Sequence, residues 1–214
     1  MKRKRPKLIH GDRFTEKIFK PYVSAIGELA LAWNDLHEKL GILFIGHFSP
    51  HRLASALWNS QQFDRPRRSM LKVVIENLPE LTQSDYPRLR DDVLWLLGEV
   101  DKLEDARNTA IHSPLLLKVD DSRLAVGNIT VNLGVPSVVP NLWLKNSRAM
   151  KLEQKDLLTE FRWCRDASMV LRDYALMLEY ATMPEECPWP DRPSLPNRGQ
   201  KRTRRSRRPP SPPK

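Results

Sequence analysis

The 214-residue chain has little cysteine and no long apolar run, and each shortage excludes a class of protein. Its two cysteines, Cys164 and Cys187, are too few for a disulfide framework and favour a reduced compartment. No segment approaches the roughly 20 apolar residues that a membrane-spanning helix needs. The charged start, residues 1–7, is not followed by the apolar stretch of a secretory signal. We therefore expect a cytoplasmic protein without a membrane partner.

Basic charge is scarce in the middle of the chain and concentrated at both ends. The formal net charge is +10, but residues 1–20 and 184–214 carry +6 each, which leaves −2 for residues 21–183. A nearly neutral middle argues against a folded domain with a broad basic face for nucleic acid. The basic ends, in contrast, can attract polyanions loosely.

Proline is concentrated at the C-terminal end, where residues 184–214 hold half of the 18 prolines and few apolar residues to bury. We expect this segment to be a disordered Pro/Arg-rich tail and residues 1–13 to be a loose basic arm. We further expect that deletion of 184–214 leaves the fold and the melting temperature nearly unchanged, because little apolar area is lost.

A run of basic residues within this tail is a candidate RNA-binding segment, because cationic side chains neutralise RNA phosphates. The residues are Lys201, Arg202, Arg204, Arg205, Arg207 and Arg208. An import signal and a soluble tail without a fixed partner are the alternatives. The spacing Arg207-x-x-Pro210-x-x-Pro213 also has the form of an SH3 ligand, a match that composition alone can produce in such a tail.

Between the two ends, apolar residues recur in steps of three and four, which is the spacing of one helix face. This pattern predicts helices over about 22–43, 67–78, 86–112 and 153–182, and Ser49-Pro50 can begin a further short helix. Residues 14–183 are therefore expected to form one all-α domain, an antiparallel bundle of four or five helices.

The segment of about 113–150 departs from this helical spacing. Leu115–Val119 and Ile129–Leu133 are β-branched or apolar, and turn-forming residues bound them at 120–122 and 127–128. We expect a small β-hairpin or irregular insertion before the last helix.

One charged residue interrupts the apolar stripe of the 86–112 helix. Arg107 lies on the face that Leu103 and Ala110 define, and arginine is rarely buried without a partner. His112 follows five residues later, where Ser113-Pro114 ends the helix. Side chains five positions apart point about 140° away from each other on a straight helix. The two can converge only if the last turn loosens or if a second copy of the chain lies opposite.

The segment Arg107-Asn108-Thr109-Ala110-Ile111-His112 resembles the signature of HEPN domains, an arginine beside a polar residue with a histidine four to six positions on. The resemblance implies a helical bundle and a metal-independent endoribonuclease, often the toxin of a toxin–antitoxin pair or an anti-phage factor. Arg107 and His112 would then be catalytic, and Asn108 would be the accompanying polar residue. It also implies a homodimer with both motifs in one cleft, RNA as substrate, an antitoxin or regulatory protein as a partner, and no cofactor.

The chemistry of RNA cleavage suits these residue types. Attack by the 2′-hydroxyl needs a base with a pKa near neutrality, which histidine supplies. The phosphate gains negative charge in the transition state, which an arginine fork can hold. A homodimer would supply two histidines, enough for a base and an acid.

The same residues also allow a structural interpretation. Arg107 can pair with an acid such as Asp92 or Glu99, and His112 can cap the helix. The sequence therefore leaves open a non-catalytic, HEPN-like helical module that binds a protein or RNA partner. We expect Arg107 to decide between the two: a cleft shared with His112 favours the enzyme, and an ion pair within the monomer favours the module.

A metal site is not expected. His47 and His51 are spaced four residues apart, as metal ligands on a helix often are, but Ser49-Pro50 lies between them and no third ligand is evident. A corner between two helices is the better interpretation of this segment.

Overall fold

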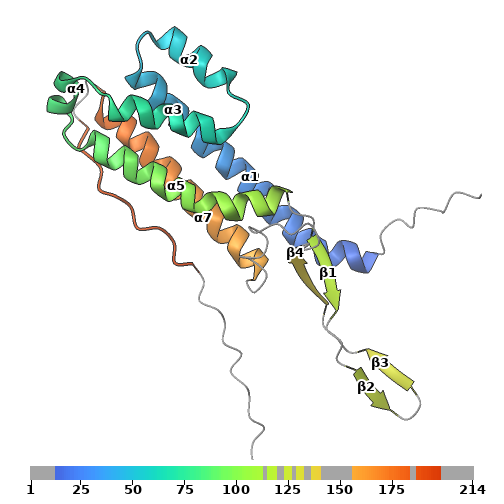
Figure 1. The fold of residues 1–214 in the computed structure, drawn as a ribbon. Coiled ribbons are helices and arrows are strands. Elements are labelled where there is room, and N and C mark those ends of the chain that lie inside the picture. Colours follow the sequence, from blue (N-terminus) through green and yellow to red (C-terminus); the bar gives the residue numbers. More distant parts are fainter. Residues whose placement is uncertain are drawn as a thin grey trace, which may run out of the picture.

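The computed structural model describes residues 13–112, 115–119, 123–126, 129–132, 136–140, 156–183 and 187–198. Three long helices form the body of the molecule and lie along one another (Figure 1): α1 (Arg13–His47), α5 (Leu89–His112) and α7 (Leu157–Ala181). Three shorter helices connect α1 to α5: α2 (His51–Ser60), α3 (Asp64–Glu76) and α4 (Glu80–Asp85). The predicted all-α bundle is confirmed. No helix in the described part of the chain is long and apolar enough to cross a bilayer.

The predicted apolar stripes of the three long helices meet in the core. Burial of one large apolar side chain contributes about 1.5–3 kcal/mol, so these stripes supply most of the stabilisation of the bundle. Fully or almost fully buried residues of the core include Leu29, Trp33, Leu36 and Leu40 of α1, Val93, Leu96 and Val100 of α5, and Phe161, Leu171 and Leu178 of α7.

Local capping fixes where the last helix begins. The Asp156 side chain accepts a hydrogen bond from the Leu158 amide at 3.1 Å, so α7 begins at Leu157 rather than near 153. An N-cap carboxylate of this kind satisfies an amide that has no partner within the helix. Helix α4 was not predicted, because six residues are too few to show a helical stripe.

The insertion consists of two antiparallel strand pairs, one nested inside the other. Strand β1 (Leu115–Val119) pairs with β4 (Pro136–Pro140), and β2 (Arg123–Val126) pairs with β3 (Ile129–Asn132). The predicted β-rich insertion is confirmed, although its two predicted strands pair with separate partners rather than with each other. The ladder extends from the end of the bundle at which α5 terminates (Figure 1).

The structure differs from the predicted disordered tail over residues 187–198, which we call the C-terminal strap. The strap has no helix or strand and returns along the bundle after α7 (Figure 1). Its Trp189 and Leu195 pack against the core, and Trp189 donates a hydrogen bond to Asp92 at 2.7 Å. The composition of the segment does not predict this packing, because the strap is held by contacts of a few side chains and not by burial of a large apolar area. The expectation that deletion of 184–214 is harmless therefore has no basis.

The remaining predictions for the two ends of the chain concern residues that the structure does not describe. Residues 1–12 of the basic arm lie outside the described residues. The six candidate RNA-binding residues do so as well: Lys201, Arg202, Arg204, Arg205, Arg207 and Arg208.

Candidate functional site

Arg107 is held inside the chain rather than presented in a free cleft. Its Nη2 lies 3.4 Å from Oδ2 of Asp64 at the start of α3, and its Nη1 donates to Oδ1 of Asn108 at 2.9 Å. The guanidinium also lies 5.5 Å from the ring centroid of Trp33 on α1. Only 20% of the Arg107 side chain is exposed. The arginine on the apolar stripe thus finds its partners within the monomer.

The expected ion pair of Arg107 exists, but neither suggested partner supplies it. Asp92 lies 15 residues earlier on α5, about 22 Å along the helix, and Glu99 lies about 12 Å away. Glu99 pairs instead with Lys102, at 2.6 Å. Asp64 could not be recognised from sequence, because only the packing of α3 beside α5 brings it next to Arg107.

Asp64 is the centre of this cluster. Its Oδ2 accepts a hydrogen bond from the Trp33 indole at 2.8 Å in addition to facing Arg107. Burial by itself raises the pKa of this carboxyl. Nearby positive charge, from His37 when protonated and from Arg107, and the indole N–H outweigh that effect and leave the Asp64 pKa below its usual value. Asp64 is therefore a carboxylate at neutral pH, and Arg107 neutralises it.

A second arginine, Arg68 of α3, is still more deeply buried, with 4% of its side chain exposed. It donates from Nε to Asp101 at 2.9 Å and from Nη2 to Glu104 at 3.2 Å, both on α5. Its Nη1 lies 3.1 Å from Nε2 of His37. These contacts join α1, α3 and α5 through one guanidinium, which uses the five-donor fork of arginine.

The sequence carried a signal for Arg68 that the analysis of the 67–78 segment missed. The apolar residues of that segment, Met70, Val73, Val74 and Leu78, predict one buried side of the helix, but Val73 is 59% exposed in the structure. The observed buried face of α3 contains Arg68, Leu71 and Ile75, again at steps of three and four. The predicted stripe is therefore wrong at Val73, whereas Met70, Val74 and Leu78 do pack in or against the core. Arg68 shares a helix face with two apolar residues, as Arg107 does with Leu103 and Ala110, and the same spacing could have identified it.

His37 lies close to both arginines but has no free nitrogen for catalysis. Its Nδ1 donates to the Trp33 carbonyl oxygen at 3.0 Å, so Nε2 is the lone-pair nitrogen that accepts from Arg68. Burial lowers the His37 pKa to about 4, and the adjacent guanidinium charges of Arg68 and Arg107 act in the same direction. His37 is therefore neutral at pH 7 and serves to hold α1 against α3.

The structure does not bring Arg107 and His112 together within one chain. Arg107 is directed at α1 and α3, whereas His112 is exposed in the last turn of α5. Asn108 accepts from Arg107 and lies 3.4 Å from Glu104, which makes it part of the same network. The predicted trio is therefore divided between a half-buried ion-pair cluster and an exposed helix end.

His51, which the sequence offers with His47 as a pair spaced like metal ligands, has a structural role. His51 donates from Nδ1 to the Ile45 carbonyl oxygen at 2.7 Å, which ties α2 to the end of α1. Among the described residues, no three His, Cys, Asp or Glu side chains form a group that could hold a metal ion. Burial raises the pKa of the Cys164 thiol to about 12, so this cysteine is a poor nucleophile.

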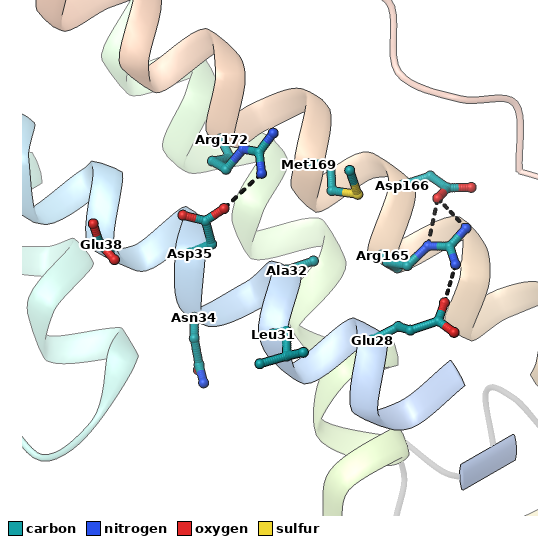
Figure 2. Close-up of a pocket in the computed structure, with 10 residues that line it drawn as sticks. All are labelled: Glu28, Leu31, Ala32, Asn34, Asp35, Glu38, Arg165, Asp166, Met169 and Arg172. Carbon is teal, nitrogen blue, oxygen red and sulfur yellow. Dashed lines mark hydrogen bonds and ion pairs between the residues drawn. The ribbon is translucent and has the colours of Figure 1, made fainter. Parts of the chain in front are cut away.

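A surface that sequence reasoning missed lies between α1 and α7, and we call it the α1–α7 groove (Figure 2). It has a volume of about 830 Å³ and an apolar floor that includes Leu31 and Met169. Leu31 is 73% exposed, which is unusual for leucine on a packed helix. Both residues lie outside the apolar stripes of their helices. This position was the only feature of the sequence that could have indicated an exposed apolar surface.

Ion pairs across the two helices border this groove (Figure 2). Arg165 of α7 bonds Glu28 of α1, and Arg172 of α7 donates to Asp35 of α1 at 2.7 Å. The α1–α7 groove therefore has an apolar centre and a charged rim.

Comparison of the chain with protein-family models, with curated proteins and with solved structures finds no match.

The depressed pKa of His37 predicts a loss of stability in mild acid. The unfolded chain takes up a proton on His37 near pH 6.5, whereas the folded chain resists protonation until about pH 4. The stabilisation is thus complete above pH 6.5 and is lost as the pH falls. Between pH 7 and 4.5 we expect His37 to reduce the free energy of unfolding by about 2–3 kcal/mol.

Urea unfolding at several pH values measures this effect. In His37→Gln the pH dependence over this range should shrink by that amount. His47→Gln should change the pH dependence in the same direction, since burial also lowers the His47 pKa. An unchanged pH slope in His37→Gln would contradict the assignment.

Proposed function

We propose that the chain is a HEPN-like, non-catalytic helical module that binds a protein partner. The observation that carries this proposal is the engagement of Arg107 with Asp64 and Trp33 inside one chain. A phosphate clamp works best when its donors are preorganised and free. Arg107 would have to leave a half-buried carboxylate unpaired before it could hold a phosphate, which is costly.

The α1–α7 groove is the surface we assign to the partner. An apolar centre surrounded by charged groups is typical of protein interfaces. The carboxylates that line this groove are Glu28, Asp35, Glu38 and Asp166, and they outnumber its arginines, Arg165 and Arg172. The partner that fits best therefore presents an apolar side chain flanked by basic ones. Excess negative charge makes the same groove unsuitable for RNA.

We place the module in the cytoplasm, because the two cysteines, Cys164 and Cys187, are not joined in a disulfide.

A metal-independent HEPN-type endoribonuclease is the second candidate. It is favoured by the position of Arg107, Asn108 and His112 in the last two turns of α5 and by the exposure of His112. In this proposal a second copy of the chain would dock at this end and place its own histidine opposite Arg107. RNA, a homodimer and an antitoxin or regulatory protein belong to this candidate.

An RNA cleavage assay separates the two functions. We expect purified protein to leave RNA intact both in EDTA and with added divalent metal, because no base and clamp converge. Expression of the wild type, His112→Ala or Arg107→Ala should affect cell growth and RNA integrity equally little. Cleavage in EDTA that yields 2′,3′-cyclic phosphate ends and disappears in His112→Ala would establish the ribonuclease instead. His10→Ala is the control and should not affect cleavage, because Arg5 and His10 repeat the Arg-x4-His spacing in the basic arm.

Substitution in the α1–α7 groove tests the binding surface. Leu31→Glu places a charge on the apolar floor and should reduce recovery of specific partners at least tenfold, because central apolar contacts dominate binding. Quantitative affinity capture from cells of the source organism measures this, with Val73→Glu on α3 as the control, since Val73 is also largely exposed and lies outside the α1–α7 groove. Equal recovery with wild type and Leu31→Glu, or a loss confined to Val73→Glu, would contradict the assignment.

A further inference from the structure

The C-terminal strap contacts the bundle with every third residue. Trp189 and Leu195 pack against the core, while Arg192 and Arg198 form ion pairs with α5 and α7. A proline follows each of the first three of these contact residues, at Pro190, Pro193 and Pro196. A polyproline II helix has three residues per turn, so a three-residue repeat places all four contacts on one side of such a helix.

The first half of the strap docks on the beginning of α5. Trp189 donates from Nε1 to Oδ2 of Asp92 at 2.7 Å, and Arg192 donates from Nε to Oδ1 of the same carboxylate at 2.6 Å. The Arg192 guanidinium also lies 5.6 Å from the ring centroid of Trp95. A carboxylate beside an indole thus receives an arginine and a tryptophan of the strap.

The second half of the strap docks on the beginning of α7 in the same manner. Arg198 donates from Nε and Nη2 to the Glu160 carboxylate at 3.0 and 2.7 Å. Its guanidinium lies 4.5 Å from the ring centroid of Trp163, whose Nε1 donates to the Pro196 carbonyl oxygen at 2.9 Å. The surface therefore repeats one unit, a carboxylate next to an indole, on two helices. We call this surface the strap groove and define it by Asp92, Trp95, Glu160 and Trp163.

The chemistry of the strap groove is that of a site for proline-rich peptides. Domains that recognise polyproline II segments offer aromatic clefts for the prolines and use the low entropy of a preformed helix. Carboxylates next to the clefts select arginine over other side chains, and guanidinium groups also stack on indole rings.

We propose that the strap groove is a binding site for proline-rich segments of other proteins that carry two arginines six residues apart, with the strap as its built-in ligand. Residues 184–186 connect the strap covalently to the segment that ends α7, but side-chain contacts hold it on the bundle. A partner segment with the same side chains can therefore compete for these contacts. Asp92 and Glu160 are buried with the strap in place, and the strap contributes one guanidinium to each of these carboxylates. This proposal concerns a different flank of α7 from the α1–α7 groove and does not depend on the function proposed above.

Binding of a synthetic peptide to the full chain tests the proposal. The peptide has the sequence of residues 188–198, and its control contains the same residues in an order that destroys the three-residue repeat. The receptor is the full-length double variant Arg192→Ala/Arg198→Ala, which weakens the strap and leaves the strap groove intact. We expect it to bind the peptide at least tenfold more tightly than wild type, whose strap occupies the site at an effective concentration on the order of millimolar.

Substitution within the strap groove provides the matched control. Adding Asp92→Asn and Glu160→Gln to the double variant should weaken peptide binding at least tenfold, because charge-assisted hydrogen bonds are lost. Circular dichroism establishes that each variant is folded. Failure of the folded double variant to bind the peptide, or equal binding of the scrambled control, would overturn the proposal.

A second measurement applies if the double variant does not fold. In wild type, a nitroxide label reacts with the exposed Cys187 and spares the buried Cys164. Excess peptide should displace the strap and increase the mobility of the label, whereas the scrambled peptide should not. A label whose mobility stays constant up to millimolar peptide would likewise overturn the proposal.

Discussion

Charged groups buried against α5 have to be neutralised, and this requirement determines how the chain is arranged around that helix. Asp92 is the clearest case, because only 2% of its side chain is exposed. Arg88, in the turn just before α5, supplies part of the compensation at 3.3 Å, and the strap supplies the rest through Trp189 and Arg192. A carboxylate at this depth is stable only when its charge is well compensated, and the strap completes that compensation, so the strap is part of the folded domain.

The same requirement decides how the end of α5 should be interpreted. Arg107 on an apolar stripe needs a carboxylate, and Asp64 provides one from α3 within the same chain. A second copy is therefore not required to accommodate this arginine, which removes the physical argument for a homodimer through α5. The HEPN resemblance stays a proposal. If the chain is a relative of that family, its arginine has taken on a structural role beside Trp33.

Much of the fold could be predicted from sequence, because it depends on periodicity. The stripes around Leu36, Val100 and Leu171 predicted three long helices that pack together, and the structure confirms them. Turn residues likewise indicated the β insertion before the last helix. Apolar periodicity could not supply the whole buried face of α3, because Arg68 occupies a place there that an apolar residue normally holds.

The strap and the partner of Arg107 could not be predicted for a related reason. Both depend on which charged side chain meets which carboxylate across the bundle, and that pairing arises only when the helices are packed. The triplets that begin at Trp189, Arg192 and Leu195 are present in the sequence. The high proline and arginine content of this segment nevertheless predicted a disordered tail. A period of three with proline in the second position of each triplet is the signal that would have distinguished the strap from the remainder of the tail.

A double-mutant cycle between Asp92→Asn and Arg192→Ala tests the central claim, that a buried carboxylate on α5 holds the strap in place. Denaturant unfolding of the wild type, both single variants and the double variant gives the coupling free energy between the two side chains. The account predicts a favourable coupling of about 1–2 kcal/mol, because the pair is charged and one partner is buried. Additive effects, with a coupling below about 0.3 kcal/mol, would contradict it.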